Sequence, residues 1–405
     1  MNRDLIKRRL IEQNIFQEKN LIEREELKEY RKYLETSQIK AIIGPRRAGK
    51  TTLGFQLLKN KSFYYVNFDD EILSLLKQEN LGLILDLLVE IFGKKEYIFL
   101  DEIQNIQGWE LFVNRLHRLG YNIFITGSNS KLLSRELSTH LGGRALSLEL
   151  MPFSFKDFLK AKNIDFLETD EGIALIKNTL LEYLKFGGFP EVILYLKDNE
   201  IIKKYYNEIF DTIVFKDIAR RFKIKNIAEL NSIASIVLNQ FGTRLSFRKI
   251  SKEVGLSIHT INKYLKYLDD SYLLLTAKKF SYKAREMELS FRKYYVIDTG
   301  LLSLKNFMID FGRQMENLVA IELKRKGFDL FYYMYDKYEI DFIADKVIQV
   351  VDDNKEIPKR ELNNGLKTAK ELKKDLLIIT WNMEKKENID GIYIEYMPLW
   401  KFLLY

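Results

Sequence analysis

The stretch IKAIIGPRRAGKTT at positions 39–52 constrains this chain more than any other segment. An apolar run ends at Gly44, a second glycine follows five positions later, and Lys50 and Thr51 then open a helix-forming segment. This order matches G-x-x-x-x-G-K-[ST], whose backbone N–H groups wrap phosphates, whose lysine reaches the β- and γ-phosphates, and whose hydroxyl binds Mg²⁺. Because both chemically required residues are present, an ATP-binding loop is favoured over a chance glycine-rich turn. The residues expected at the nucleotide are Gly44, Pro45, Arg46, Arg47, Ala48, Gly49, Lys50, Thr51 and Thr52.

A second motif, YIFLDEIQNI, begins at Tyr97. Its four apolar or aromatic residues predict a buried parallel strand that presents Asp101 and Glu102 at its carboxyl end. We expect Asp101 to hold Mg²⁺ through its water shell, and Glu102 to orient and deprotonate the attacking water. An acidic strand-to-loop junction without catalytic meaning is common in isolation, but the upstream phosphate loop disfavours that alternative.

Two further turns supply candidate catalytic residues. A strand predicted at 122–126 ends in Gly-Ser-Asn-Ser, and in ATPases with a glutamate after this aspartate such a strand lies between the two motif strands. Ser128 or Asn129 would then sense the γ-phosphate, and Ser128 is preferred. Arg144 stands on a Gly-Gly-Arg turn before a strand predicted at 145–150. It could neutralise transition-state charge in cis or across a homo-oligomer interface, although surface arginines are common.

The middle of the chain predicts helices followed by a helix-turn-helix. The helical pattern from 152 to about 221 is broken at Gly187-Gly188-Phe189-Pro190, as expected of a helical lid. Further on, Ser246–Val254 predicts one helix, Gly255 a turn, and Ser257 the cap of a second helix. That helix should bury Ile258, Ile261, Leu265 and Leu268 and should direct His259, Thr260, Lys263 and Lys266 outward.

The charge of this segment favours DNA as a partner. Between Arg244 and Lys283, nine Lys and Arg residues stand against three Asp and Glu residues. Such an excess supports contact with double-stranded DNA through a winged helix, and the alternative is a winged helix that serves only for packing or dimerisation.

The last module alternates strands and helices in the order of a restriction-endonuclease-like core. Glu316 is predicted on a helix, Asp341 after a strand, and Gln349 and Val351 on a further strand. In such a core, an acidic-x-Lys unit on that strand would complete the metal site. Here Gln349 stands at the acidic position and Val351 stands at the position of the lysine. Two carboxylates can hold one Mg²⁺, but cleavage also needs a group that activates water or neutralises the phosphate. We therefore predict no nuclease activity. In the alternative, the chain is a nuclease, and a lysine from elsewhere, such as Lys355, replaces the missing lysine of the strand.

The composition of the chain limits which metal it is expected to bind, which partners it suits and where in the cell it is expected to be. At 405 residues the chain is too long for one ordinary core. With no cysteine and three scattered histidines, a transition-metal site is disfavoured, and Mg²⁺ held by oxygens is the expected metal. The net charge of +8 fits a polyanion partner, although a lysine-rich proteome would give the same balance. No apolar run is long enough to cross a bilayer and the first residues show no signal-peptide core, so a cytoplasmic location without membrane contact is expected.

Taken together, the chain resembles an archaeal and bacterial family of AAA+-type ATPases that carry a C-terminal winged helix and a degenerate endonuclease-like domain. The segments that carry the resemblance are GPRRAGKTT at Gly44–Thr52, FLDEIQNI at Phe99–Ile106, ITGSNS at Ile125–Ser130, Gly143-Arg144 with the following MPFSF, GGFPEV at Gly187–Val192 and EIDFIAD at Glu339–Asp345. The resemblance implies ATP binding at Lys50 and Thr51, metal at Asp101, water activation at Glu102 and phosphate sensing at Ser128 or Asn129. It also implies that Gln349 could serve where nucleases of the family carry a metal ligand, whereas Val351 cannot replace their lysine.

The expected fold is α/β: a P-loop, AAA+-like parallel sheet with a helical lid, a winged helix-turn-helix and an α/β endonuclease-like domain. The expected boundaries are a helical segment at 1–36, the ATPase core at 37–150, the lid at 151–222, the winged helix at 223–284 and the endonuclease-like domain at 285–405. The first functional hypothesis is a Mg²⁺-dependent ATPase that couples nucleotide state to binding of DNA or a protein partner. The alternatives are an ATP-dependent nuclease and a nucleotide-gated regulatory scaffold without nucleic acid.

Overall fold

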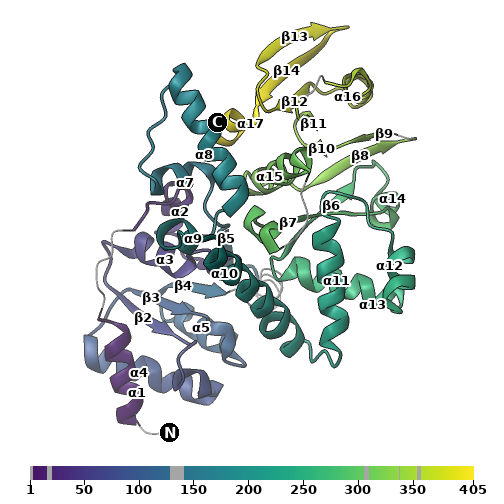
Figure 1. Ribbon diagram of the computed structural model, residues 1–405. Coiled ribbons are helices and arrows are strands. Elements are labelled where there is room, and N and C mark those ends of the chain that lie inside the picture. Colours follow the sequence, from purple (N-terminus) through teal and green to yellow (C-terminus); the bar gives the residue numbers. More distant parts are fainter. Residues whose placement is uncertain (1–2, 16–20, 128–140, 305–309, 337, 354–356) are drawn as a thin grey trace. The chain divides into compact units, whose positions relative to one another are not determined.

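The computed structural model describes residues 3–15, 21–127, 141–304, 310–336, 338–353 and 357–405 (Figure 1). The chain divides into two compact units, Met1–Pro152 and Phe153–Tyr405. The helices expected to form a lid therefore belong to the second unit. Within the residues that the structure describes, no helix combines the length and the apolar character needed to cross a bilayer.

The first unit is built on a five-stranded parallel sheet in the order β2-β3-β4-β1-β5. All five residues of β1 and of β3 are buried, as expected for central parallel strands that are covered on both faces. β4 lies between β3 and β1, which confirms the strand order expected from the two motifs. The strands are β1 (Ile39–Ile43), β2 (Phe63–Asn67), β3 (Tyr97–Asp101), β4 (Asn122–Gly127) and β5 (Ala145–Glu149).

Helices cover both faces of this sheet. One core cluster joins Ile6 and Leu10 of α1 to residues of α4 and α5, and a second joins Leu27 of α2 to residues of α3. Because neighbouring residues of a strand point to opposite faces, Ala41 belongs to the first cluster and Ile42 to the second. The helices are α1 (Arg3–Gln13), α2 (Glu26–Tyr30), α3 (Lys50–Leu58), α4 (Leu81–Phe92) and α5 (Trp109–Arg118), with 3₁₀ turns η1 (Arg31–Tyr33), η2 (Leu73–Leu75), η3 (Gln78–Asn80) and η4 (Ile103–Asn105).

The second unit begins with helices that are joined at the predicted glycine turn. Gly187 ends α8 with φ 78°, and a Cβ there would lie 1.9 Å from Oδ1 of Asp298. Asp298 is buried, and its carboxylate accepts the N–H of Gly188 at 2.6 Å and the hydroxyl of Tyr206 at 2.9 Å. Any residue with a Cβ at position 187 would collide with the buried carboxylate of Asp298, so the turn requires glycine there. The elements are α7 (Phe155–Ala161), α8 (Asp170–Phe186), α9 (Pro190–Tyr195), α10 (Asn199–Thr212) and the π-helix η5 (Ile213–Arg220).

The helix-turn-helix segment follows the sequence prediction closely. Ser246 caps one helix, Gly255 turns the chain at φ 70°, and Ser257 accepts the N–H of Thr260 to cap the next helix. One part of the prediction is wrong: Ile258 is 41% exposed, because it is the first residue of its helix and lies outside the buried stripe. The elements are α11 (Ile227–Asn239), α12 (Phe247–Val254), α13 (Ile258–Asp270), β6 (Leu274–Lys279), α14 (Ala284–Leu289) and β7 (Lys293–Val296), and β6 and β7 pair antiparallel.

Two sheets complete this unit, in the orders β7-β6-β8-β9 and β10-β11-β12-β14-β13. In the second sheet, β11, β12 and β14 run parallel, while β10 and β13 are antiparallel edge strands. The elements are η6 (Thr299–Leu304), α15 (Phe311–Arg325), β8 (Phe331–Tyr335), β9 (Tyr338–Ile340), β10 (Phe342–Ile343), β11 (Val347–Val350), α16 (Lys359–Leu372), β12 (Leu376–Thr380), β13 (Lys385–Ile389), β14 (Ile392–Pro398) and α17 (Leu399–Leu404).

Candidate active site

The loop between β1 and α3 requires glycine at both of its motif positions. A Cβ on Gly44 would lie 2.0 Å from the carbonyl oxygen of Leu150, and the residue has φ 150°. Gly49 has φ 94° and immediately precedes α3, so the loop enters the helix through a left-handed residue. This geometry leaves the first N–H groups of α3 at the loop, where a phosphate would meet them.

Lys50 is held inside this loop. Its side chain is buried, and Nζ donates to the carbonyl oxygens of Gly44 at 3.1 Å and Pro45 at 2.8 Å. The ammonium group therefore lies within the curve of the loop.

Asp101 lies at the centre of a buried network of hydroxyl groups. Its Oδ2 accepts the hydroxyls of Thr51 at 2.9 Å and Tyr65 at 2.8 Å, and its Oδ1 accepts the hydroxyl of Thr126. These donors come from α3, β2 and β4, which flank β3 or follow the phosphate loop. The structure thus brings the predicted pair Thr51 and Asp101 together, and it fixes the carboxylate from three sides.

Glu102 follows in an uncommon backbone conformation. Its φ is 51°, and its N–H donates to Oγ1 of Thr126 at 2.9 Å. Burial raises the pKa of the Glu102 carboxyl above its usual 4.5, and Lys50 opposes that rise. Gln104 donates to Oε2 of the same carboxylate. A carboxyl group with a raised pKa beside a phosphate loop suits proton abstraction, and strained backbone is often found at such sites.

Arg24 supports the loop from the N-terminal segment. Its guanidinium is buried and donates to the carbonyl oxygens of Ala48 at 3.0 Å and Met151 at 2.8 Å. It therefore ties the phosphate loop to the end of the first unit.

The structure describes the predicted catalytic arginine but not the predicted phosphate sensor. Ser128 and Asn129 lie outside the described residues. Arg144 precedes β5, and its carbonyl accepts the N–H of Ile39 at the start of β1, whereas the phosphate loop follows the end of β1. At about 3.3 Å per strand residue, this places Arg144 roughly 17 Å from the loop, at the opposite edge of the parallel sheet. A catalytic role for Arg144 in cis is therefore wrong, and its Nη1 lies 3.4 Å from Oδ1 of Asn114 instead.

Sequence reasoning missed Tyr65, Thr126 and Arg24. Thr126 had a usable signal, because the last side chain of a strand next to β3 can reach the same edge as Asp101. Tyr65 pairs with Phe99 across β2 and β3, so its side chain shares a face with Asp101 two residues further on. This contact depends on register, which the sequence did not supply. Arg24 had no such signal.

The outward residues of the helix-turn-helix lie where they were predicted. His259, Lys263 and Lys266 are exposed on α13, and Thr260 is half-buried. Nζ of Lys263 lies 5.8 Å from the ring centroid of Tyr267.

The acidic residues of the last module converge in part. Glu316 lies on α15, Asp341 between β9 and β10, and Gln349 on β11, and all three are at least partly buried. Glu316 and Asp341 face one lysine, Lys293 of β7, which sequence reasoning did not place there. Lys355 lies outside the described residues. The lysine that faces these acids thus comes from β7 and not from the strand of Gln349, where the sequence has Val351.

Family comparisons agree with this description. Residues 36–159 match the model of an AAA domain, and residues 177–309 match a domain of unknown function, DUF8612. The uncharacterized protein MJ1544 of Methanocaldococcus jannaschii is 40% identical over 399 residues, which cover 91% of this chain and 88% of the relative. An uncharacterized protein of Haemophilus influenzae is 33% identical over 405 residues, which cover 94% of this chain and 99% of the relative.

Among solved structures, the Walker-type ATPase paby2304 of Pyrococcus abyssi aligns with a TM-score of 0.48 at 14% identity, over 70% of this chain and 96% of that chain. The chain belongs to the same family as the M. jannaschii and H. influenzae relatives, and its first unit carries an AAA domain with a P-loop ATPase fold.

Proposed function

We propose that this chain is a Mg²⁺-dependent ATPase that couples ATP binding and hydrolysis to the binding of double-stranded DNA. The observation that carries the ATPase part is the convergence of Thr51, Asp101 and Glu102 beside the loop that holds Lys50. The DNA part depends on the helix-turn-helix and its charge.

Each residue of the first site has a separable role. Lys50 would leave its carbonyl acceptors to neutralise the β- and γ-phosphates. The Thr51 hydroxyl and the Asp101 carboxylate, 2.9 Å apart, are oxygen donors of the kind that Mg²⁺ prefers, and they fit that ion together with water and phosphate oxygens. When bound, Mg²⁺ would neutralise charge on the β- and γ-phosphates. Glu102 would accept a proton from the water whose oxygen attacks the γ-phosphorus while the bond to the β-phosphate oxygen breaks.

Two substitutions test this assignment. Glu102→Gln should retain ATP binding and lower the hydrolysis rate by about 10²-fold or more, because an amide cannot accept the proton. Lys50→Ala should abolish binding or hydrolysis, because it deletes the charge held within the loop. Glu79→Gln, an exposed glutamate of the same unit, is the matched control. Unchanged turnover in Lys50→Ala would refute the site, and loss of ATP binding in Glu102→Gln would make that residue structural.

The arrangement of α11, α12 and α13 with the antiparallel pair β6 and β7 supports a winged helix. The exposed residues of α13 begin at its N-terminal turn, which is the part of a recognition helix that meets base edges. Lys263 and Lys266 lie one turn apart and would contact phosphates. His259 and Thr260 would lie closer to the bases.

A salt titration of duplex binding tests this part. Lys263→Ala combined with Lys266→Ala should weaken binding to all sequences and should lower the salt slope by about two, because each phosphate contact contributes roughly 0.9. Lys367→Ala combined with Lys370→Ala is the matched control, because these exposed lysines have the same spacing on α16. Equal loss in both pairs would indicate a general charge effect.

A protein partner is the other occupant of this module. If duplex affinity is weak and insensitive to both lysine pairs, the module serves packing or protein binding, and the chain is a nucleotide-gated scaffold. ATP hydrolysis, measured separately, keeps that outcome distinct from failure of the ATPase assignment.

A further inference from the structure

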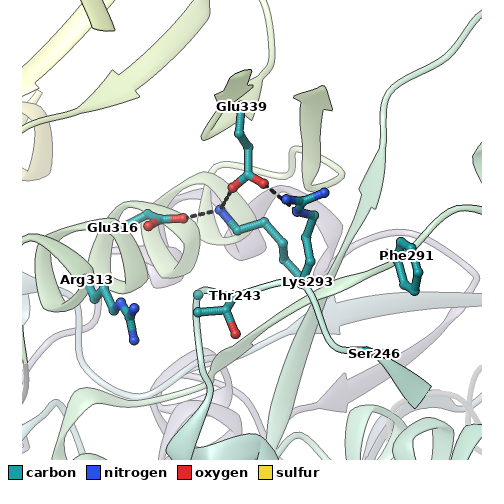
Figure 2. Close-up of a pocket in the computed structure, with 9 residues that line it drawn as sticks. Thr243, Ser246, Phe291, Lys293, Arg313, Glu316 and Glu339 are labelled. Atoms are coloured by element: carbon teal, nitrogen blue, oxygen red, sulfur yellow. Dashed lines mark hydrogen bonds and ion pairs between the residues drawn. The ribbon is translucent and has the colours of Figure 1, made fainter. Parts of the chain in front are cut away.

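A buried ammonium group lies among the acidic residues of the last module. The Lys293 side chain is 1% exposed, and its Nζ lies 2.6 Å from Oε1 of Glu316 and 2.8 Å from Oε1 of Glu339 (Figure 2). The same Nζ lies 3.9 Å from Oδ1 of Asp341. The carboxylates come from α15, β9 and the turn after β9, while the lysine comes from β7. One cation of the chain thus joins three acids from separate elements.

Other donors of the chain complete the bonding of these acids. The Tyr295 hydroxyl donates to Oε1 of Glu316 at 2.6 Å, and the N–H of Val350 donates to Oδ2 of Asp341 at 2.9 Å. Nε of Arg244 lies 2.9 Å from Oε2 of Glu339. Each carboxylate therefore has a protein partner, and two positive side chains already offset the three negative ones.

A divalent ion does not fit this arrangement. Among the described residues, no group of three His, Cys, Asp or Glu side chains is placed to hold a metal ion. Mg²⁺ requires about six oxygens at roughly 2.0–2.1 Å in an octahedron, and the space between Glu316 and Glu339 is taken by Nζ of Lys293. Gln349 carries a neutral amide where a nuclease-like site would carry an acid. The site therefore contains one negative charge fewer for a metal ion to balance.

The cluster nevertheless lies at a surface depression. It forms one wall of a pocket of about 450 Å³ whose other lining residues include Thr243, Arg244, Phe291 and Arg313. Glu316 and Glu339 line this pocket, so metal ions in solution can reach these two acids, and their exclusion depends on Lys293.

We propose that Lys293 takes the place of the divalent metal ion in this endonuclease-like module, so that the module binds no catalytic metal and does not cleave phosphodiesters. This inference concerns the second unit alone and does not depend on the ATPase assignment. It also gives the predicted lack of cleavage a different cause: the lysine is present, but it occupies the position of the metal.

Binding of Mn²⁺, followed by electron paramagnetic resonance without nucleotide, tests the proposal. The parent protein carries Asp101→Asn, which removes the carboxylate proposed to hold metal in the first unit. This parent should bind no Mn²⁺ at millimolar concentration. Adding Lys293→Met, which keeps the length of the side chain and removes its charge, should create one site that binds Mn²⁺ with a dissociation constant about tenfold or more below the millimolar range. A further Asp341→Asn should abolish the new site, and Lys279→Met, which removes a lysine paired with Glu286 and not with the acids of the cluster, should create none.

A second measurement covers the case in which Lys293→Met does not fold. Amine-reactive labelling of the wild-type chain, read by mass spectrometry, should find Lys293 protected with and without Mn²⁺. Metal-dependent labelling of Lys293 would overturn the proposal, because it would show that a metal displaces the ammonium group. So would Mn²⁺ binding by the parent that is lost in Glu316→Gln, or cleavage of linear, branched or single-stranded DNA that disappears in Asp341→Ala.

Discussion

Replacement of Tyr65 by phenylalanine isolates one hydrogen bond of the Asp101 network. The Tyr65 hydroxyl lies 2.8 Å from Oδ2 of Asp101, and its ring lies 4.9 Å from Phe55 and 5.4 Å from Phe99 between centroids. Phenylalanine keeps these ring contacts. Any change in the variant therefore reports the loss of the hydroxyl alone.

The magnitude follows from what remains around the carboxylate. A hydrogen bond to a charged group contributes about 1.5–3 kcal/mol. Asp101 keeps its bonds to Thr51 and Thr126 in the variant, so the charge is not left unpaired. We therefore expect the lower end, about 1.5 kcal/mol, which corresponds to a fall of about 3–6 °C in the melting temperature of a unit of this size.

The same substitution should change metal dependence without changing the chemistry. A carboxylate with fewer donors is less well oriented, and loss of such outer contacts typically costs about tenfold or more in metal affinity. The Mg²⁺ concentration for half-maximal ATP hydrolysis should rise by about tenfold, while kcat at saturating Mg²⁺ should stay near that of the wild type.

Calorimetry and Mg²⁺ titration of ATP turnover on the full chain measure both effects. Tyr121→Phe is the control, because Tyr121 is a half-buried tyrosine of the same unit that lies against Tyr64, with 6.4 Å between ring centroids. If Tyr65→Phe has wild-type stability and Mg²⁺ dependence, then Asp101 is not held by this hydroxyl, and the network does not orient the metal site.

Three further predictions concern other parts of the chain. Gly44→Ala should abolish binding of a fluorescent ATP analogue, because its Cβ would lie 2.0 Å from the carbonyl oxygen of Leu150; wild-type affinity would contradict the loop geometry. Arg144→Ala should leave ATP turnover within about twofold of the wild type in dilute protein, and a large loss that depends on protein concentration would assign the residue to a subunit interface. Burial raises the pKa of Asp298 to about 6 from 3.8, so the folded state favours its protonated form and its contribution to stability is lost as pH rises from about 4 to about 6. The free energy of unfolding of the wild type, relative to Asp298→Asn, should fall by about 3 kcal/mol over that range in urea titrations, and a flat difference would exclude this titration.

Local motifs predicted the candidate ATP site of the first unit because its residues lie in short, continuous segments of the sequence. Gly44, Lys50 and Thr51 lie in one loop and helix start, and Asp101 ends a strand whose apolar residues are contiguous. The parallel sheet then brings the ends of β1, β3 and β4 to one edge. Motif spacing and strand order together predicted that Thr51 and Asp101 lie close to each other, and the two side chains are 2.9 Å apart in the structure.

The parts that the sequence did not predict depend on contacts between distant segments. Arg144 was assigned to catalysis because it stands on a glycine turn, but a parallel sheet separates the turns before its strands from those after them. Lys293 is separated from Glu316 and Asp341 by elements whose pairing no motif specifies. Gln349 lies on β11, whereas the lysine that faces Glu316 and Asp341 lies on β7.

The position of Lys293 on β7 links the acidic cluster to the helix-turn-helix. The N–H of Gly242 donates to the carbonyl of Tyr294 at 2.8 Å, Arg244 forms a β-bridge with Lys293, and Arg244 also pairs with Glu339. The chain between α11 and α12 is therefore bonded to the strand that carries the resident ammonium group, and β7 also pairs with β6. A change that moved α12 and α13 alone would break these backbone bonds and would expose a buried charge cluster, at a cost of several kcal/mol. The segment that joins α11 to α12 and the strand that carries Lys293 are therefore held together by both backbone and side-chain bonds.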